Sequence, residues 1–484
     1  MMRIFSKKNL LITVLLLLLF LLCLKFPLDP DMGWHLRNGE LLLKERSLPE
    51  TDPYSHTMPD FPVIFHEWLT DIGMFLIVDN LSFLALVVIF GLLTMAAYLL
   101  VAKSCKAKFE YQIIAAILGG IASIQIIGPR PQMITLLGLA AVIYLYNRFK
   151  ENPRTKLIWL LPLIMALWVN LHGGFAIGLF ILGLFSLIEL GRHGLKKLFK
   201  KWQVKLISWQ AWWKLNIAIV LSAAATLLNP YGWRIYQEIL RTVTDSYAKQ
   251  TIIEWFPVQF SNVNAAYFFA YLALFIILLI FAWRKIDLGY LAITIIFAYL
   301  AFSSWRNIPL FILVSIPFWV LFVKQLTGET LSKFLTSKTA LVILLICLAM
   351  IGQRQYIDLV PDTQSVVKLA EKANWPYQMV QWLKDNPQEG NPFNEYNWGG
   401  YLVWQLPEQK LFIDGRMTHW RQGGLAILQV HQDILRLQEG WQEDLEGLNV
   451  DWAMLRKNEP LAHVLQELDW QPLYQDDLAI VLRK

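Results

Sequence analysis

The sequence has few charged residues for its length. Of its 484 residues, 17% are charged and 56% are hydrophobic, whereas a soluble globular domain has about 25% charged and about 45–50% apolar residues. The hydrophobic excess is concentrated in uninterrupted apolar runs, long enough to cross a bilayer as helices. This composition excludes an ordinary soluble protein and predicts a polytopic membrane protein.

Cysteine is scarce, and charge is unevenly distributed along the chain. Of the three cysteines, Cys23 and Cys347 lie in apolar runs and Cys105 in a basic segment, so neither a disulfide framework nor a cysteine metal site is predicted. From Gln353 onward there are 12 basic and 19 acidic residues, against 31 basic and 18 acidic residues before it. Because the basic excess lies in short segments between apolar runs, it indicates membrane topology and no nucleic-acid partner.

Eleven apolar runs are interpreted as membrane-spanning helices. The first follows basic residues, as in a signal peptide, but Leu24–Pro27 offers no small-residue cleavage site, and we therefore expect a retained span. The runs are residues 9–26, 81–102, 112–128, 131–148, 157–171, 174–190, 216–232, 264–283, 287–304, 307–324 and 339–352.

The loops between these runs predict the orientation of the chain. With a cytoplasmic N-terminus, 22 basic residues fall on the cytoplasmic side and 8 on the opposite side, which is a strong positive-inside bias. An odd number of spans then places the C-terminal domain outside the cytoplasm. A twelfth span at Phe65–Asp79 would invert every later loop, so this stretch is predicted to be an amphipathic helix on the outer surface.

Short polar motifs at the ends of the runs all fall on the predicted outer side. Polar side chains at the membrane are costly unless they line a wet cavity or pair with one another. The motifs therefore predict a functional site that opens away from the cytoplasm. They occupy residues 29–36, 49–55, 66–69, 128–132, 168–174, 228–233 and 303–307.

Asp31 precedes a helix-like stretch, Met32–Arg46, and supports two interpretations that the sequence leaves open. Its carboxylate either caps the helix by accepting backbone hydrogen bonds, or acts as a catalytic base or metal ligand with His35, one turn later on the same face. Asp52, which precedes Pro53, is predicted to stabilise a turn.

Isolated arginines occur at the outer ends of two spans. Arg130 lies between two prolines that fix its backbone, and its forked donors suit a phosphate or pyrophosphate. The alternative for Arg130 and Arg306 is that they snorkel to lipid headgroups. His172, two residues after Asn170, is either a helix-cap residue or a contact to a sugar hydroxyl or phosphate.

The chain combines one span, an acidic first loop with an aspartate just past that span, about ten further spans and a C-terminal α/β domain. In this order of features it resembles the GT-C superfamily of polytopic membrane glycosyltransferases, which use polyprenyl-phosphate-linked sugars. It is also similar to a group of bacterial membrane proteins with an Asp-x-x-Trp-His-Leu opening. The matching motifs are Asp31–Glu40, Leu48–Pro49, Asp52–Ser55, His66–Leu69, Arg130–Gln132, Asn170–Gly173, Asn229–Gly232, Tyr396–Leu402 and Phe412–Arg416.

The resemblance implies an inverting transferase of the bacterial inner membrane. It would move a sugar from a polyprenyl-phosphate donor to a glycan, lipid or protein acceptor outside the cytoplasm. Asp31 and His35 would be the catalytic residues, with Asp31 as the base. Arg130 would neutralise the charge of the departing lipid phosphate. The turns 128–132 and 170–174 contain no carboxylate, so no metal or other cofactor is assigned, although a divalent ion stays an open alternative. The other predicted substrate contacts are His66, Glu67, Gln132, Asn170, His172 and Arg306.

From Gln353 onward the pattern is that of a soluble α/β domain. It contains no Gly-rich phosphate loop, nucleophile elbow or zinc spacing. Asp414 and Arg416 are predicted to fix a turn, with glycan recognition as the alternative. The predicted helices are residues 378–384, 425–437 and 461–468, the predicted strands are 401–405, 410–413 and 452–455, and a hairpin is predicted at 470–474 and 479–482.

Taken together, the sequence predicts an α-helical polytopic membrane protein with about 11 transmembrane helices and a C-terminal extracytoplasmic α/β domain. Residues 1–352 would form the membrane domain, with the first outer loop at 27–80, and residues 353–484 the outer domain. A non-enzymatic transporter, lipid-handling protein or assembly subunit on the same scaffold is the alternative. The lack of an internal repeat and of an ionisable residue deep inside a span argues against transport.

Overall fold

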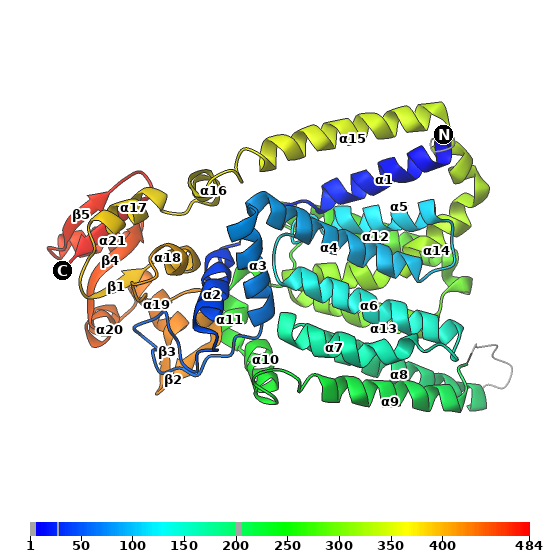
Figure 1. The fold of residues 1–484 in the computed structure, drawn as a ribbon, viewed down its shortest axis with the longest axis horizontal. Helices are drawn as coiled ribbons and strands as arrows, with labels where there is room; N and C mark the ends of the chain where they lie inside the picture. The colour runs from blue at the N-terminus through cyan, green and yellow to red at the C-terminus, as the bar shows by residue number, and fades with distance from the viewer. Residues whose placement is uncertain (1–5, 27–28, 199–205) are drawn as a thin grey trace. The chain divides into compact units, whose positions relative to one another are not determined.

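The computed structural model describes residues 6–26, 29–198 and 206–484 and is mainly helical (Figure 1). Each of the eleven apolar runs contains one α-helix. These helices are α1 (Lys7–Cys23), α4 (Phe83–Lys103), α5 (Phe109–Ala122), α6 (Gln132–Glu151), α7 (Leu160–Leu171), α8 (Phe175–Leu198), α9 (Trp209–Ala225), α12 (Ala266–Ala282), α13 (Leu288–Ser303), α14 (Ile308–Leu335) and α15 (Lys338–Leu359).

Within the described residues, five helical segments are long and apolar enough to cross a membrane. Three further apolar helices are shorter. The predicted apolar helices of a membrane protein are therefore present in the structure. That all eleven cross the membrane stays a prediction. The five segments are Phe83–Lys103, Phe175–Lys196, Val263–Lys285, Trp305–Gln325 and Lys338–Leu359.

The chain forms two compact units. Unit 1 comprises Met1–Phe26, Val87–Arg234 and Thr251–Asp358, and unit 2 comprises Pro27–Leu86, Ile235–Gln250 and Leu359–Lys484. The first long loop therefore packs in one unit with the C-terminal residues, which follow it by more than 270 positions.

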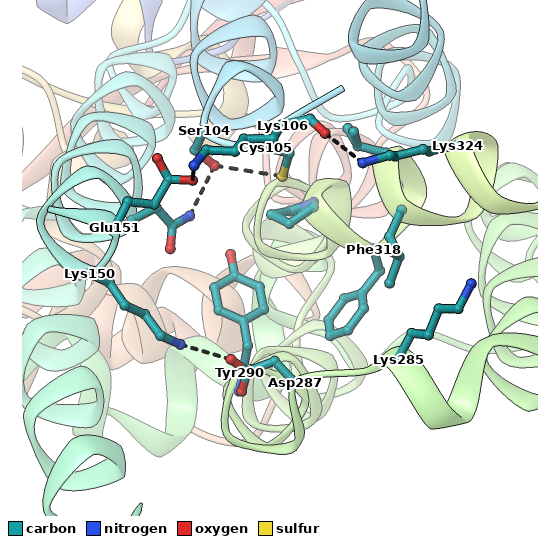
Figure 2. Close-up of a pocket in the computed structure, with 14 residues that line it drawn as sticks. Ser104, Cys105, Lys106, Lys150, Glu151, Lys285, Asp287, Tyr290, Phe318 and Lys324 are labelled. Atoms are coloured by element: carbon teal, nitrogen blue, oxygen red, sulfur yellow. Dashed lines mark hydrogen bonds and ion pairs between the residues drawn. The ribbon is translucent and has the colours of Figure 1, made fainter. Parts of the chain in front are cut away.

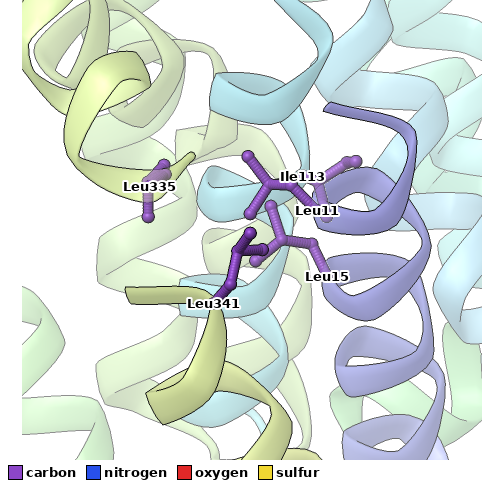
Figure 3. Packing of buried hydrophobic residues seen from close by; sticks show 5 residues of the cluster. All are labelled: Leu11, Leu15, Ile113, Leu335 and Leu341. Atoms are coloured by element: carbon purple, nitrogen blue, oxygen red, sulfur yellow. The ribbon is translucent and has the colours of Figure 1, made fainter. Parts of the chain in front are cut away.

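Unit 1 is a helical bundle in which α1 packs on α5, α5 on α14, and α13 on α14 (Figure 1). One apolar cluster of this bundle joins α1, α5, α14 and the start of α15 through Leu11, Leu15, Ile113, Leu335 and Leu341 (Figure 3). By contrast, only 11% of the apolar window in Lys338–Leu359 is buried. Such a face is costly in water and stable in lipid.

Two helices of the first loop form the start of unit 2. The predicted helices at Met32–Arg46 and Phe65–Asp79 are confirmed as α2 (Met32–Glu45) and α3 (Trp68–Asn80), which pack against each other. The two backbones approach closely at Gly39, where a Cβ atom would lie 2.2 Å from the carbonyl oxygen of Asp71. Only glycine permits this approach.

The same helix α2 packs against α18 (Gly399–Gln405). A Cβ on Gly33 would lie 2.1 Å from the Gly400 carbonyl oxygen, and a Cβ on Gly400 would lie 2.3 Å from the Pro30 carbonyl oxygen. The glycines of two distant motifs thus let two backbones touch. The strand predicted at residues 401–405 was wrong, because this short apolar stretch is a buried helix that follows the glycine pair.

A four-stranded sheet with strand order β1-β4-β6-β5 forms the core of the C-terminal part of unit 2. β1 (Asn391–Asn394) runs parallel to β4 (Val450–Arg456), and β6 (Ala479–Arg483) pairs antiparallel with both β4 and β5 (Gln471–Gln475). The predicted strand at 452–455 and the closing hairpin are confirmed. β1 was not predicted, since its sequence Asn-Pro-Phe-Asn lacks β-branched residues.

Three predicted helices of this part are confirmed as α17 (Tyr377–Asp385), α19 (Ile427–Leu435) and α21 (Pro460–Glu467). The strand predicted at 410–413 was wrong: within the described part of the chain, Leu411 forms one isolated bridge, to Ser55 of the first loop. The remaining α-helices and strands are α10 (Arg234–Thr244), α11 (Ser246–Thr251), α16 (Val366–Ala373), α20 (Trp441–Gly447), β2 (Arg421–Gln422) and β3 (Leu425–Ala426). The short 3₁₀-helices, labelled η, are η1 (Leu157–Trp159), η2 (Ile253–Trp255), η3 (Val263–Ala265), η4 (Trp283–Lys285), η5 (Trp305–Asn307), η6 (Tyr396–Trp398) and η7 (Gly415–His419).

Candidate functional site

A buried cluster of one histidine and two carboxylates connects α2 and α3 in unit 2. His35 lies in the first turn of α2, where its Nδ1 atom is 2.6 Å from Asp71 Oδ1 and 3.6 Å from Glu67 Oε2. Asn38, one turn further along α2, donates a hydrogen bond of 2.9 Å to the second oxygen of Asp71. The exposed fractions of His35, Glu67 and Asp71 are 3%, 6% and 1%. Buried charges of this kind require partners.

The neighbouring carboxylates make His35 a cation at neutral pH. Burial by itself lowers the pKa of His35, but the charge and hydrogen bond of Asp71, followed by the charges of Glu67 and Asp31, raise it to about 9. Burial raises the pKa of Asp71, although His35 counteracts the shift. Because the pair shares one proton across a short hydrogen bond, we assign that proton to His35.

The cluster continues into a longer His–carboxylate network, which we define as Asp71, His35, Glu67, His66, Glu238 and His419. His66 Nε2 lies 3.3 Å from Glu67 Oε1, and His419 Nε2 lies 2.7 Å from Glu238 Oε1. Partial burial lowers the pKa of His66, whose side chain is 35% exposed, but the charge and hydrogen bond of Glu67 and the charge of Glu238 raise it to about 9. Burial tends to raise the pKa of Glu238, but the hydrogen bond and charge of His419 lower it. Imidazoles and carboxylates therefore stabilise one another along the network.

His35, Glu67 and Asp71 could also hold a metal ion, since one ligand atom from each lies within 4.8 Å of the others. One nitrogen and two carboxylate oxygens suit a divalent ion such as Zn²⁺ or Mn²⁺. A metal ligand must present an unprotonated ring nitrogen, whereas Nδ1 of His35 contacts Asp71 at a hydrogen-bond distance. The donor set thus fits either a proton or a divalent cation between the carboxylates.

Asp31 is the N-cap residue of α2, but its side chain does not cap the helix. Instead, Asp31 Oδ1 accepts a hydrogen bond of 2.9 Å from Trp34 Nε1. The same oxygen packs against Gly415, where a Cβ atom would lie only 1.9 Å away. The predicted N-cap role of the Asp31 carboxylate was therefore wrong. Gly415, the glycine of the Asp-Gly-Arg motif, leaves the space that this carboxylate occupies.

Arg416 forms a second buried centre in unit 2. It donates hydrogen bonds from Nε and Nη2 to the two oxygens of Asp414, at 2.9 and 2.6 Å, and from Nη2 to Asp52 Oδ1, at 2.8 Å. Its guanidinium also lies 4.6 Å from the ring centroid of Tyr54 and 5.3 Å from that of Trp420. Asp52 additionally accepts a hydrogen bond from the backbone amide of Ser55. The predicted structural roles of Asp52, Asp414 and Arg416 are confirmed, and these residues join the first loop to the C-terminal turn.

In unit 1, the polar turns of four helix pairs meet at one end of the bundle. Thr135 of α6 contacts His172 after α7 at 2.7 Å, and Asn170 donates a hydrogen bond of 2.9 Å to the carbonyl oxygen of Leu228 after α9. Ser304, before α14, donates a hydrogen bond to the carbonyl oxygen of Glu254. The turns at 128–132, 170–174, 228–233 and 303–307 are therefore neighbours, as their shared predicted side requires.

The two arginines at this end have partners. Arg130 Nη1 forms an ion pair of 2.5 Å with Glu254 Oε1, and the guanidinium of Arg306 lies 4.5 Å from the ring centroid of Trp255. Gln132, in the first turn of α6, has a buried Oε1 atom without a hydrogen-bond partner among the described residues. No sequence pattern links Glu254 to Arg130, because the two residues lie about 120 positions apart.

His172 and Asn170 have structural roles at this end. His172 is the C-cap residue of α7, and its Nδ1 accepts a hydrogen bond of 2.8 Å from the backbone amide of Gly174. A Cβ on Gly174 would lie 2.0 Å from Thr135 Oγ1, which also contacts His172 Nδ1. Asn170 donates hydrogen bonds to the carbonyl oxygens of Ala166 and Leu228. The helix-cap interpretation of His172 is confirmed.

No protein-family model matches this chain, and a search of curated proteins finds no match. Among solved structures, the chain is similar to the Archaeoglobus fulgidus oligosaccharyltransferase tethered with an acceptor peptide containing the NVT sequon. The TM-score is 0.53 at 13% identity, over 93% of this chain and 69% of that chain. A second structure of that enzyme, in complex with Zn and sulfate, gives a TM-score of 0.42 at 12% identity, over 92% of this chain and 68% of that chain.

The first of these similarities shows that the chain has the fold of an oligosaccharyltransferase along nearly its whole length. The fold that the sequence resemblance leads us to expect is therefore shared with this membrane enzyme. At 13% identity the similarity concerns the fold alone.

Proposed function

We propose that this protein is a membrane glycosyltransferase that moves a sugar from a polyprenyl-phosphate donor to an acceptor outside the cytoplasm. The observation that carries the proposal is the oligosaccharyltransferase fold, shared over 93% of the chain. The motifs that resemble GT-C enzymes lie within this fold. The acceptor would be a glycan, lipid or protein, and the site of action a bacterial inner membrane with the N-terminus in the cytoplasm.

Asp31 would act as the catalytic base. Its carboxylate would remove the proton of the acceptor hydroxyl while the acceptor oxygen attacks the anomeric carbon and the bond to the lipid phosphate breaks with inversion. The charge of Asp31 contributes to the raised pKa of His35, and by the same interaction the His35 cation stabilises ionised Asp31. His35 is thus proposed as the group that keeps the base charged, with Glu67 and His66 holding His35 through the network.

Arg130 would neutralise the phosphate that departs with the lipid. In the structure it pairs with Glu254, so the phosphate would replace a carboxylate on a guanidinium already oriented by its neighbours. Gln132 and Arg306 would add contacts at the same end of unit 1. Asn170 and His172 would position the turns that carry these groups.

The domain boundaries belong to the same proposal. Residues 1–352 would be the membrane domain, with the first outer loop at 27–80 exposed outside, and residues 353–484 the outer domain. The contacts of the first loop with the C-terminal residues support this arrangement: Thr57 donates a hydrogen bond of 2.6 Å to the carbonyl oxygen of Phe412, and Arg416 pairs with Asp52. Both parts of unit 2 would then lie on one side of the membrane.

The test measures sugar transfer in membranes that contain the protein, with a panel of radiolabelled polyprenyl-phosphate sugars. We expect Asp31→Asn to lower transfer by at least about 100-fold at unchanged protein level, since a general base typically contributes about 10²–10⁴-fold. Asp60→Asn, an exposed aspartate of the same loop, is the matched control and should keep full transfer. Full transfer by Asp31→Asn would remove the assigned base, and no transfer by the wild type with any donor would favour a transporter or assembly subunit.

A further inference from the structure

A cavity of about 330 Å³ lies in unit 1 where the basic loops of the bundle meet (Figure 2). It is bounded by the connection between α4 and α5, the end of α6, the connection between α12 and α13, and the middle of α14. The volume is near the lower end of the range of about 300–1,000 Å³ for small-molecule sites. It can hold a headgroup with its phosphate, but not a whole lipid.

The cavity has an excess of positive charge. Four lysines and two carboxylates line it. Each carboxylate is already paired: Glu151 lies 3.5 Å from Lys106, and Asp287 lies 2.8 Å from Lys150. Lys285 and Lys324 have no carboxylate partner among the described residues. Two positive charges therefore remain for an anion.

A hydroxyl group inside the cavity lacks a partner. Tyr290 OH is buried without a hydrogen bond among the described residues, and Figure 2 shows it pointing into the space enclosed by the labelled side chains. A buried hydroxyl without a partner is unfavourable. An anionic group in the cavity would accept its hydrogen bond within a lining that contains four lysines.

One wall of the cavity is apolar and belongs to a predicted membrane helix. Pro317, Phe318, Val320 and Leu321 of α14 line it, within the segment Trp305–Gln325 that is apolar enough to cross a membrane. Pro317 lies inside the helix and cannot donate a backbone hydrogen bond. The lysines suit a charged headgroup, and the apolar residues of α14 suit the adjoining hydrocarbon. This combination fits a lipid better than a free ion.

We propose that this cavity binds the phosphate of an anionic phospholipid, with Lys285 and Lys324 as the charged ligands and Tyr290 as the hydrogen-bond donor. The positive-inside bias predicts that these loops face the cytoplasmic leaflet, where anionic lipids bind basic pockets between helices. The site shares no residue with Asp31 and its network, and it does not rest on the proposed transferase activity.

The test titrates the detergent-purified full-length protein with dioleoyl phosphatidylglycerol and measures lipid binding by native mass spectrometry. Because one lysine near an anionic lipid contributes roughly fivefold in affinity, the double variant Lys285→Gln/Lys324→Gln should weaken binding by roughly 25-fold. Tyr290→Phe should weaken it by roughly tenfold, as a lost hydrogen bond to a charged group. The charge-retaining variant Lys285→Arg/Lys324→Arg should bind the lipid and shows that the fold is intact.

Three controls decide the assignment. Lys333→Gln/Lys338→Gln removes two exposed lysines outside the cavity and should leave binding unchanged. Dioleoylglycerol, which has the acyl chains without the phosphate, should not compete, and neither should inorganic phosphate at millimolar concentration. If the Lys333/Lys338 variant loses as much lipid binding as the Lys285/Lys324 variant, the cavity is not the binding site. If inorganic phosphate displaces the lipid at millimolar concentration, the cavity binds a free anion and not a lipid.

Discussion

Removing the Arg416 guanidinium should destabilise unit 2 more than any exposed charge change in that unit. The exposed side-chain fractions of Asp52 and Asp414 are both 0%, and that of Arg416 is 7%. Arg416→Met keeps an apolar stem of similar length but leaves two buried carboxylates without their cation. The carboxylates also raise the pKa of Arg416 above its ordinary value against the effect of burial, so the cation is firmly held.

Breaking a buried ion pair by removing one partner costs about 3–5 kcal/mol. Unit 2 contains about 200 residues, a size at which 1 kcal/mol shifts the melting temperature by about 2–4 °C. The expected loss is therefore about 10 °C. Adding Asp414→Asn to Arg416→Met removes one uncompensated charge and should recover part of this loss.

The assay heats full-length protein in detergent, applies a short protease pulse and quantifies peptides from residues 359–484. Arg456→Met is the matched control, since the Arg456 side chain is 37% exposed, lies 3.5 Å from Glu395 and stacks on Trp398. Glu395 is itself buried, but it keeps hydrogen bonds from the Asn397 side chain and the Trp398 backbone amide, so the loss of the more exposed Arg456 should cost less than the loss of Arg416. If Arg416→Met lowers the midpoint no more than Arg456→Met does, the buried centre does not stabilise the unit as argued.

Two further predictions concern the packing and the charge of α2. Gly33→Ala should disrupt the contact with α18, because its Cβ would overlap the Gly400 carbonyl oxygen. Gly73→Ala is the control: its Cβ would have nothing within 4 Å, so the change should be neutral or stabilising by up to about 1 kcal/mol. The same protease assay compares the two variants, and equal unfolding midpoints would refute the close approach of α2 and α18. The pKa of His35 is raised from 6.5 to about 9, so the charged imidazole stabilises unit 2 fully below pH 6.5 and progressively less as the pH rises through 9. His35→Gln should therefore reduce the loss of midpoint between pH 6.5 and 9, and an unchanged pH profile would show that His35 does not carry the proton.

The elements of the fold follow largely from local patterns in the sequence. Each apolar run contains a helix, and the stretches at Met32–Arg46 and Phe65–Asp79 are helices as predicted. The errors concern short segments such as residues 401–405, where a few apolar residues fit a buried helix and a buried strand equally well. Length and periodicity determine long elements, because their hydrophobic pattern repeats over several turns.

The candidate site was identified only in part from the sequence. His35, His66 and Glu67 were recognised by residue type, and Asp71 carries a signal that was available, since it follows Glu67 by one helical turn. Glu238 and His419 have no such signal. They join the His–carboxylate network because unit 2 brings together segments that are 181 positions apart.

The sequence by itself determined the membrane character, the helices and the residue types that suit phosphate and proton chemistry, since hydropathy and turn signals act over a few residues. Only the tertiary structure decided that Arg130 pairs with Glu254, that Arg416 joins Asp52 to Asp414, and that Tyr290 lines one cavity with four lysines from four separate segments. Partners of buried charges are chosen by packing between distant segments. No local pattern encodes that choice, because many acidic residues along the chain would serve each arginine equally well.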